Sequence, residues 1–158
     1  MSITAAKNSR IALAILCGIG AFSLVLAQEQ KPARSPSVWD GVYSQLQADR
    51  GKARYESTCS GCHGDELEGD VVEHPELAGG GFVDKWNGLN LAQLYERIHR
   101  DMPMDHPGSL SRETSIDLVA YLLSANHFPA GEYDLPRDLE ILKQIRIERE
   151  RPKPARGK

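Results

Sequence analysis

The stretch CSGCHG, residues 59–64, decides the fold of this chain. Cys59, Cys62 and His63 form the pattern C-x-x-C-H, in which two thiols can add across the vinyl groups of a haem and the adjacent histidine can ligate its iron. The spacing has a geometric reason, because two intervening residues set the sulfurs a vinyl-to-vinyl distance apart along a tight turn. We therefore predict one covalently attached haem c, bound through Cys59 and Cys62, with His63 as an iron ligand.

Other uses of paired cysteines find less support in the sequence. A thioredoxin-like redox pair needs a strand before it and a parallel sheet around it, and neither is indicated here. A zinc site needs four ligands, and no second C-x-x-C or H-x-x-x-H cluster accompanies the motif. A disulfide between Cys59 and Cys62 would close a tiny, strained loop that constrains the chain very little.

The first 27 residues have the layout of a secretory signal peptide. Lys7 and Arg10 precede an apolar run from Ile11 to Leu26, which is followed by Ala27. A run of 16 residues is short for a bilayer span, so we predict cleavage and export to the periplasm, with retention as a membrane anchor as the alternative. Cleavage removes Cys17 and leaves Cys59 and Cys62 as the only cysteines; bulky Leu16 argues against a lipid anchor on Cys17.

The charge changes sign along the chain. Residues 28–136 hold 9 basic and 18 acidic side chains, whereas residues 137–158 hold 8 basic and 4 acidic ones. An acidic body repels phosphate and the basic tail has no aromatic residue, so no nucleic-acid partner is expected.

The length of 158 residues fits one domain with additional segments at its ends. We predict a signal peptide at residues 1–27, a polar linker at 28–38, the haem-bearing domain at 39–135 and a C-terminal extension with a basic tail at 136–158. Periodicity predicts helices at 45–57, at 91–100 and from residue 111 or 112 to 125; Asn90 and Gln93 cap the second. The glycine-rich stretch 64–90 is expected to be irregular.

The iron of an electron-transfer haem usually takes a second protein ligand, and methionine is the residue that raises the potential. Outside the signal peptide the only methionines are Met102 and Met104. Met102 directly follows a predicted helix and precedes Pro103, which stiffens the backbone, so we favour Met102 over Met104. The rival ligands are the four other histidines, and one of them lies in the same loop as Met102: His74, His99, His106 and His127.

The C-terminal extension has an ambiguous period. One set of positions would align on a helix, namely Leu135, Leu139, Leu142 and Ile145. Another would align on a strand, namely Ile141, Ile145 and Ile147. The last eight residues, RPKPARGK, have the composition of a disordered tail.

These features together resemble class I cytochromes c: a helix entering CSGCHG, a loop with HPELAGG, a helix ending in MP, and a final helix with DLVAYLL. The resemblance covers about residues 42–135 and implies the all-α cytochrome c fold, with about three to five helices around one haem. It also implies that the Pro75 carbonyl accepts a hydrogen bond from the His63 ring. Gly51 and Tyr121 would mark the crossing of the first and last helices.

More narrowly, residues 102–135, MPMDHPGSLSRETSIDLVAYLLSANHFPAGEYDL, are similar to the cytochrome c domains that accompany pyrroloquinoline-quinone dehydrogenases. In those domains the methionine of MP is an axial ligand, which assigns this role to Met102. Trp86 lies where related proteins place a tryptophan near a haem propionate. Such domains are often fused to a dehydrogenase propeller, which this sequence does not contain, so the electron donor stays open.

The sequence thus predicts a periplasmic single-haem c-type cytochrome that shuttles single electrons between a dehydrogenase and an acceptor such as a terminal oxidase. It is predicted to be an electron-transfer protein and not an enzyme. One alternative is a dedicated subunit of a quinoprotein dehydrogenase, with residues 135–150 clamped onto its partner. Another is a haem enzyme or gas sensor whose iron has an open sixth position.

Overall fold

The computed structural model describes residues 34–70 and 72–153 of the chain. The predicted signal peptide with Cys17, the first part of the predicted linker, and residues 154–158 of the basic tail lie outside the described residues. No helix among the described residues is both long enough and apolar enough to cross a membrane.

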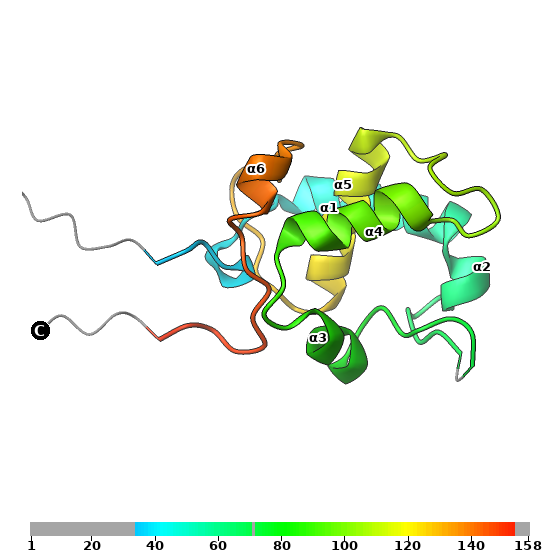
Figure 1. Cartoon of the computed structure of the whole chain (residues 1–158), viewed down its shortest axis with the longest axis horizontal. Helices are drawn as coiled ribbons and strands as arrows, with labels where there is room; N and C mark the ends of the chain where they lie inside the picture. Colours follow the sequence, from blue (N-terminus) through cyan, green and yellow to red (C-terminus); the bar gives the residue numbers. More distant parts are fainter. Residues whose placement is uncertain (1–33, 71, 154–158) are drawn as a thin grey trace, which may run out of the picture. The chain divides into compact units, whose positions relative to one another are not determined.

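Helices dominate the described part of the chain, where no β-strand forms (Figure 1). This confirms the predicted all-α fold class. The helical segments α2 and α6 are single turns of four residues each. In chain order the elements are a 3₁₀ turn η1 at Val38–Asp40, α1 at Gln45–Thr58, α2 at Ser60–His63, α3 at Gly80–Trp86, α4 at Leu91–Asp101, α5 at Arg112–Ala125 and α6 at Leu139–Leu142.

The three long helices lie where the sequence predicts them, and each begins at a side-chain cap. The Ser44 hydroxyl accepts a hydrogen bond from the backbone N–H of Gln47 at the start of α1, and Ser111 caps α5 in the same way. Asn90 and Gln93 form the predicted capping box at the start of α4. These caps satisfy backbone donors that have no partner within a helix.

Gly51 marks the crossing of α1 and α5, as the resemblance implies. A Cβ atom at this position would lie 2.0 Å from the backbone oxygen of Asp117 and 2.8 Å from the Cβ of Tyr121. Only glycine permits this approach of two helix backbones. One turn later the rings of Tyr55 and Tyr121 pack against each other, with their centroids 5.3 Å apart.

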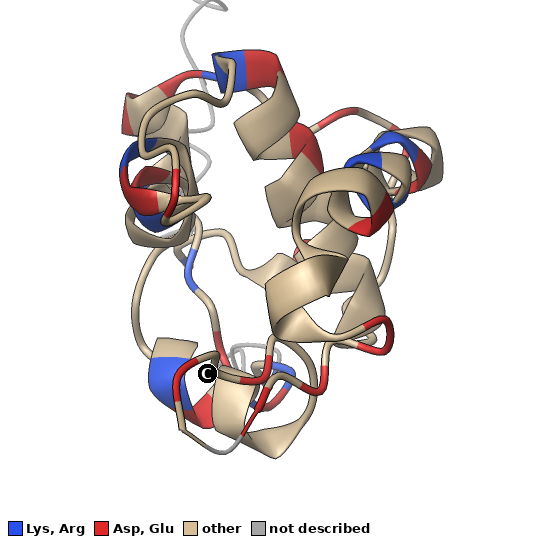
Figure 2. Cartoon of the chain, turned by 90° about the vertical axis from the view of Figure 1, so that its right-hand side faces the viewer, with Lys and Arg blue, Asp and Glu red and all other residues tan. Residues whose placement is uncertain are grey.

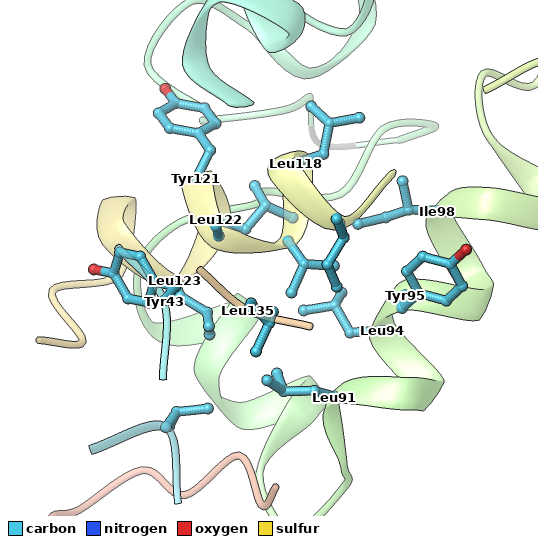
Figure 3. Close-up of a cluster of buried hydrophobic side chains, with 14 of the residues drawn as sticks. Tyr43, Leu91, Leu94, Tyr95, Ile98, Leu118, Tyr121, Leu122, Leu123 and Leu135 are labelled. Carbon is cyan, nitrogen blue, oxygen red and sulfur yellow. The ribbon is translucent and has the colours of Figure 1, made fainter. Parts of the chain in front are cut away.

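Helix α4 packs on the other side of α5 and completes the apolar core. Figure 3 shows Leu94 and Ile98 of α4 beside Leu118 and Leu122 of α5. All four side chains are buried. Further apolar side chains of α5 are likewise buried: Ile116, Val119, Ala120 and Leu123.

The prediction of an irregular stretch over residues 64–90 is wrong for its last third, where α3 forms. Gly80 and Gly81 weaken helix propensity, but Phe82 and Trp86, one turn apart, are only 1% and 8% exposed and hold the helix on the core. Tertiary burial therefore overrides the local sequence signal. The predicted place of Trp86 beside a haem propionate stays a prediction.

The C-terminal extension packs on its own domain. Leu142 and Ile147 are fully buried and Ile145 is 5% exposed, whereas Ile141 faces solvent at 44%. The apolar stripe that the partner-clamp alternative invokes is thus largely covered by the chain itself. This finding removes the sequence argument for that clamp.

Residues 145–147 lie in extended conformation between two distant segments of the chain. The backbone of Arg146 donates to Pro36 and accepts from Val38, and Ile147 donates to Leu89 at 2.9 Å. Ser37 and Val38, which the sequence analysis assigns to the linker, are fully buried by this arrangement. The extension is therefore part of the folded unit at residues 34–153.

Candidate haem-attachment site

The C-x-x-C-H motif occupies the end of α1 and the single turn α2. Cys59 caps the C-terminus of α1 by donating its backbone N–H to the Tyr55 carbonyl at 2.8 Å. The backbone N–H of His63 then bonds to the Cys59 carbonyl at 2.9 Å. Residues three apart share a helix face, so this turn places Cys59 and Cys62 on one side. Both thiols are free; Cys59 is half-buried and Cys62 is exposed.

His63 is held by one ring nitrogen. Its Nδ1 lies 3.0 Å from the backbone oxygen of Pro75, and the residue is only 9% exposed. A carbonyl oxygen can only accept, so Nδ1 carries the proton and Nε2 keeps its lone pair. A neutral imidazole with this tautomer is the form that ligates a metal. The contact with Pro75 that the resemblance implies is confirmed.

The loop at residues 64–79 carries Pro75 and is closed by backbone hydrogen bonds. The N–H of Gly69 bonds to the His63 carbonyl at 2.8 Å, and the N–H of Leu77 bonds to the Leu67 carbonyl at 2.8 Å. The Tyr55 hydroxyl donates to the Gly64 carbonyl at 2.6 Å and joins the loop to α1. Burial is the main cause that raises the pKa of the Tyr55 phenol, which therefore stays a donor.

Asp70 organises the outer turn of this loop. One of its carboxylate oxygens accepts hydrogen bonds from the backbone N–H groups of Val72, Glu73 and His74. These donors, with the Glu73 N–H first, and the His74 ring hold the pKa of Asp70 well below its ordinary value of 3.8. The turn therefore depends on an ionised carboxylate.

Asn126, directly after the last predicted helix, is a site-related residue that the sequence did not single out. Its side chain is buried and contacts the segment just after Pro75: Nδ2 donates to the Leu77 carbonyl at 2.9 Å, and Oδ1 accepts from the Gly79 N–H at 3.0 Å. These partners lie 49 and 47 residues away in sequence. The sequence signal is limited to the stretch NHFPAG, residues 126–131, which contains Asn126 without indicating a role.

The two candidate methionines differ in burial. Met102 is the C-cap residue of α4, bonded through its N–H to the Ile98 carbonyl at 3.2 Å, and is half-buried. Met104 is 68% exposed. In Figure 1 the loop that leaves α4 and the turn α2 both lie at the right-hand end of the drawn chain. Met102 as the sixth ligand stays a prediction, which this difference in burial supports.

The four rival histidines each have a partner or face solvent. The Nδ1 atom of His99 lies 3.1 Å from the Ser115 hydroxyl, and that of His106 lies 3.1 Å from Asp105 with the side chain 75% exposed. His127 is exposed. His74 contacts Asp70 and packs edge-on against His63, with the ring centroids 6.0 Å apart.

The thiols do not have the character of an exchange-active redox pair. Burial, and secondarily the neighbouring Cys62, raise the pKa of the Cys59 thiol to about 11. Catalytic cysteines of thioredoxin-like sites have a lowered pKa instead. Within residues 34–70 and 72–153, no three His, Cys, Asp or Glu side chains gather to hold a metal ion, so the zinc alternative finds no support.

The donor set fits covalent haem. Two free thiols on one turn match two vinyl groups, and the adjacent imidazole keeps Nε2 for iron while Nδ1 is engaged by a carbonyl. Cys59, Cys62 and His63 would hold the group from the side of α2. Their assignment as attachment and ligand residues stays a prediction that this geometry supports.

An acidic surface adjoins the motif. Six carboxylates within the loop at residues 64–79 are exposed, and that loop contains no Lys or Arg: Asp65, Glu66, Glu68, Asp70, Glu73 and Glu76. Figure 2 looks onto this end of the chain and shows acidic segments along the loop.

The comparison with protein-family models agrees with the motif. Residues 46–122, from α1 to near the end of α5, match the family model of cytochrome c oxidase, cbb3-type, subunit III. No curated protein matches the chain. Among solved structures, the chain is similar to one in the crystal structure of the sulfane dehydrogenase SoxCD from Paracoccus pantotrophus, with 24% identity and a TM-score of 0.47. That alignment covers 79% of this chain and 68% of the other.

Proposed function

We propose that the chain is a class I c-type cytochrome that binds a single haem through Cys59 and Cys62 and shuttles electrons between two periplasmic proteins, a proposal that the family match over residues 46–122 supports. His63 and Met102 would hold the haem iron in this proposal. The observation that carries it is the His63 ring, whose Nδ1 is engaged by the Pro75 carbonyl and whose Nε2 is left for iron.

The haem supplies reversible one-electron exchange when it is bound. The residues of the chain adjust that exchange. The Pro75 carbonyl accepts a hydrogen bond from the His63 Nδ1–H, which fixes the ring and makes Nε2 a stronger donor. The Met102 thioether favours the reduced state, and burial of His63 at 9% exposure limits access of water to the ligand.

The exposed carboxylates of the loop at residues 64–79 lie beside the attachment motif and favour partners with a basic rim. Such encounters are brief and steered by charge, so their rates fall as ionic strength rises. We propose a dehydrogenase as the donor, since the sequence resembles cytochrome domains that accompany quinoprotein dehydrogenases. A downstream carrier or terminal oxidase is the proposed acceptor.

The test combines the mass and the optical spectrum of the exported protein. The proposal expects a chain heavier by one haem, reversible reduction by one electron, and a low-spin spectrum that carbon monoxide does not change. Replacing both Cys59 and Cys62 by Ala should abolish the covalent attachment. Rapid binding of carbon monoxide by the wild type would show an open sixth position and favour the enzyme or sensor alternative.

A further inference from the structure

Both polar atoms of the Asn126 side chain form hydrogen bonds within the protein. Oδ1 accepts from the Gly79 N–H at 3.0 Å, while Nδ2 donates to the Leu77 carbonyl at 2.9 Å and to the Leu122 carbonyl at 2.8 Å. The residue is only 8% exposed, so water is a poor substitute for these partners. Asn126 therefore joins the end of α5 firmly to the segment that follows Pro75.

The segment after Pro75 is hydrogen-bonded to two different parts of the chain. Leu77 offers its carbonyl to Asn126, while its own N–H bonds to the Leu67 carbonyl at 2.8 Å. Pro75 lies two residues before Leu77 and has no N–H with which to anchor itself. The position of the Pro75 carbonyl thus depends on how firmly Leu77 and Gly79 are fixed.

We propose that Asn126 is a positioning residue for the axial ligand His63, acting through the carbonyl of Pro75. This inference rests on the proposed function, because it assigns Asn126 to the haem ligand named there. The chain of contacts runs from α5 to Asn126, to Leu77 and Gly79, to Pro75, and to Nδ1 of His63. A shorter or longer bond at Nδ1 changes how strongly Nε2 donates to iron.

A merely structural role for Asn126 would be the capping of α5 through Leu122. The two roles predict different effects on the stability of the protein and on the His63 ring. Loss of a cap lowers the stability of the protein and leaves the His63 ring unchanged. Loss of the clamp on Leu77 and Gly79 frees the Pro75 carbonyl, weakens its bond to Nδ1 and makes the imidazole a poorer donor.

The experiment compares Asn126→Leu and Asn126→Asp with Asn90→Ala in the haem-loaded protein. Leucine removes both arms of the clamp, and aspartate keeps only the acceptor for the Gly79 N–H. Asn90 is a matched control, because its side chain also caps a helix, at the start of α4, and bonds to Gln93. The readouts are the solvent-exchange rate of the His63 Nδ1 proton, measured by NMR, and the reduction potential.

We expect Asn126→Leu to speed exchange of that proton by about tenfold, because loss of buried hydrogen bonds raises the open population of the loop. Its reduction potential should rise, since a weaker imidazole donor stabilises the oxidised iron less. Asn126→Asp should show a smaller rise in the exchange rate, which is its readout because the added carboxylate charge by itself lowers the potential. Asn90→Ala should lose stability without changing either readout.

The inference is overturned if Asn126→Leu loses stability as Asn90→Ala does while exchange and potential stay at their wild-type values. Should Asn126→Leu fail to fold, Asn126→Asp decides by the exchange rate of the His63 Nδ1 proton. A wild type without attached haem, or with an open sixth position, refutes the proposed function and this inference together. A normal wild type with unchanged Asn126 variants refutes this inference alone.

Discussion

The crossing of α1 and α5 and the loop at residues 64–79 are built by different interactions. At the crossing, Gly51 lets the backbone of one helix lie against Asp117 of the other, and aromatic rings fill the next turn. In the loop, carbonyls, a carboxylate and the Asn126 amide fix the chain through hydrogen bonds. The crossing carries stability by packing, whereas the loop sets the surroundings of His63 by polar contacts.

Substitutions in these two regions should therefore change different properties of the protein. Changes at the crossing should alter the free energy of unfolding, because close-packed interiors tolerate extra atoms poorly. Changes in the loop should alter the ligand to iron at a smaller cost in stability. Three pairs of variants test this difference between the packed crossing and the polar loop, beginning with the largest expected effect.

Gly51→Ala should be the most damaging single change. Its Cβ would lie 2.0 Å from the Asp117 oxygen, so α1 and α5 must separate, at a cost of roughly 3 kcal/mol of unfolding free energy. Denaturant unfolding followed by circular dichroism measures this loss. Gly80→Ala is the control, because no atom lies within 4 Å of its added Cβ, and it should be neutral or slightly stabilising. Equal stability of the two variants would contradict the account of the crossing.

Ile147→Ala tests whether the C-terminal extension belongs to the packed part of the molecule. Ile147 is fully buried, so its truncation should cost about 2 kcal/mol of unfolding free energy. Ile141→Ala, at a position 44% exposed in the same extension, should cost no more than about 0.5 kcal/mol. Thermal unfolding of the two variants measures these losses of stability. Similar losses in both variants would mean that the extension does not pack as described.

Asp70→Asn should give the smallest effect, which is present at neutral pH and disappears in acid, where the wild-type carboxylate also becomes neutral. The pKa of Asp70 is lowered in the fold, so its contribution is complete above its ordinary value of 3.8 and is lost as pH falls through the lowered value. Hydrogen exchange of the Val72, Glu73 and His74 amides should therefore show a steeper acid loss of protection in the wild type than in the variant.

Asp138→Asn is the control for that experiment. Asp138 caps a helix by accepting one backbone N–H, from Glu140, whereas one oxygen of Asp70 accepts three. The control should leave the pH profile of the loop unchanged. An identical acid profile in the wild type and Asp70→Asn would show that the carboxylate does not organise the turn.

The long helices could be predicted because their signals are local. Asn90 and Gln93 form their capping box within one turn, and the apolar positions of α5 repeat at helical spacing. Helix α3 was not predictable in this way, because burial of Phe82 and Trp86 stabilises it against the glycines before it. The extension was ambiguous because a helical turn at α6 is followed directly by extended residues, so both periods are present.

In the candidate site, too, the local contacts could be predicted from the sequence and the distant ones could not. Cys59, Cys62 and His63 lie within one turn, so the motif alone predicts their arrangement. The contact from Pro75 to His63 needed the resemblance to a known family. The clamp by Asn126 could not be predicted, because it joins residues almost fifty positions apart through an amide that also fits a simple helix end.

The most direct test of the central claim is the optical spectrum of the exported, oxidised protein for the wild type, Met102→Ala and Met104→Ala. Met102 is half-buried at the end of α4, whereas Met104 is 68% exposed. The account predicts that Met102→Ala abolishes the weak far-red methionine–iron band and that Met104→Ala keeps it. Loss of the band only in Met104→Ala, or its absence from the wild type, would contradict the assignment of His63 and Met102 as the axial pair.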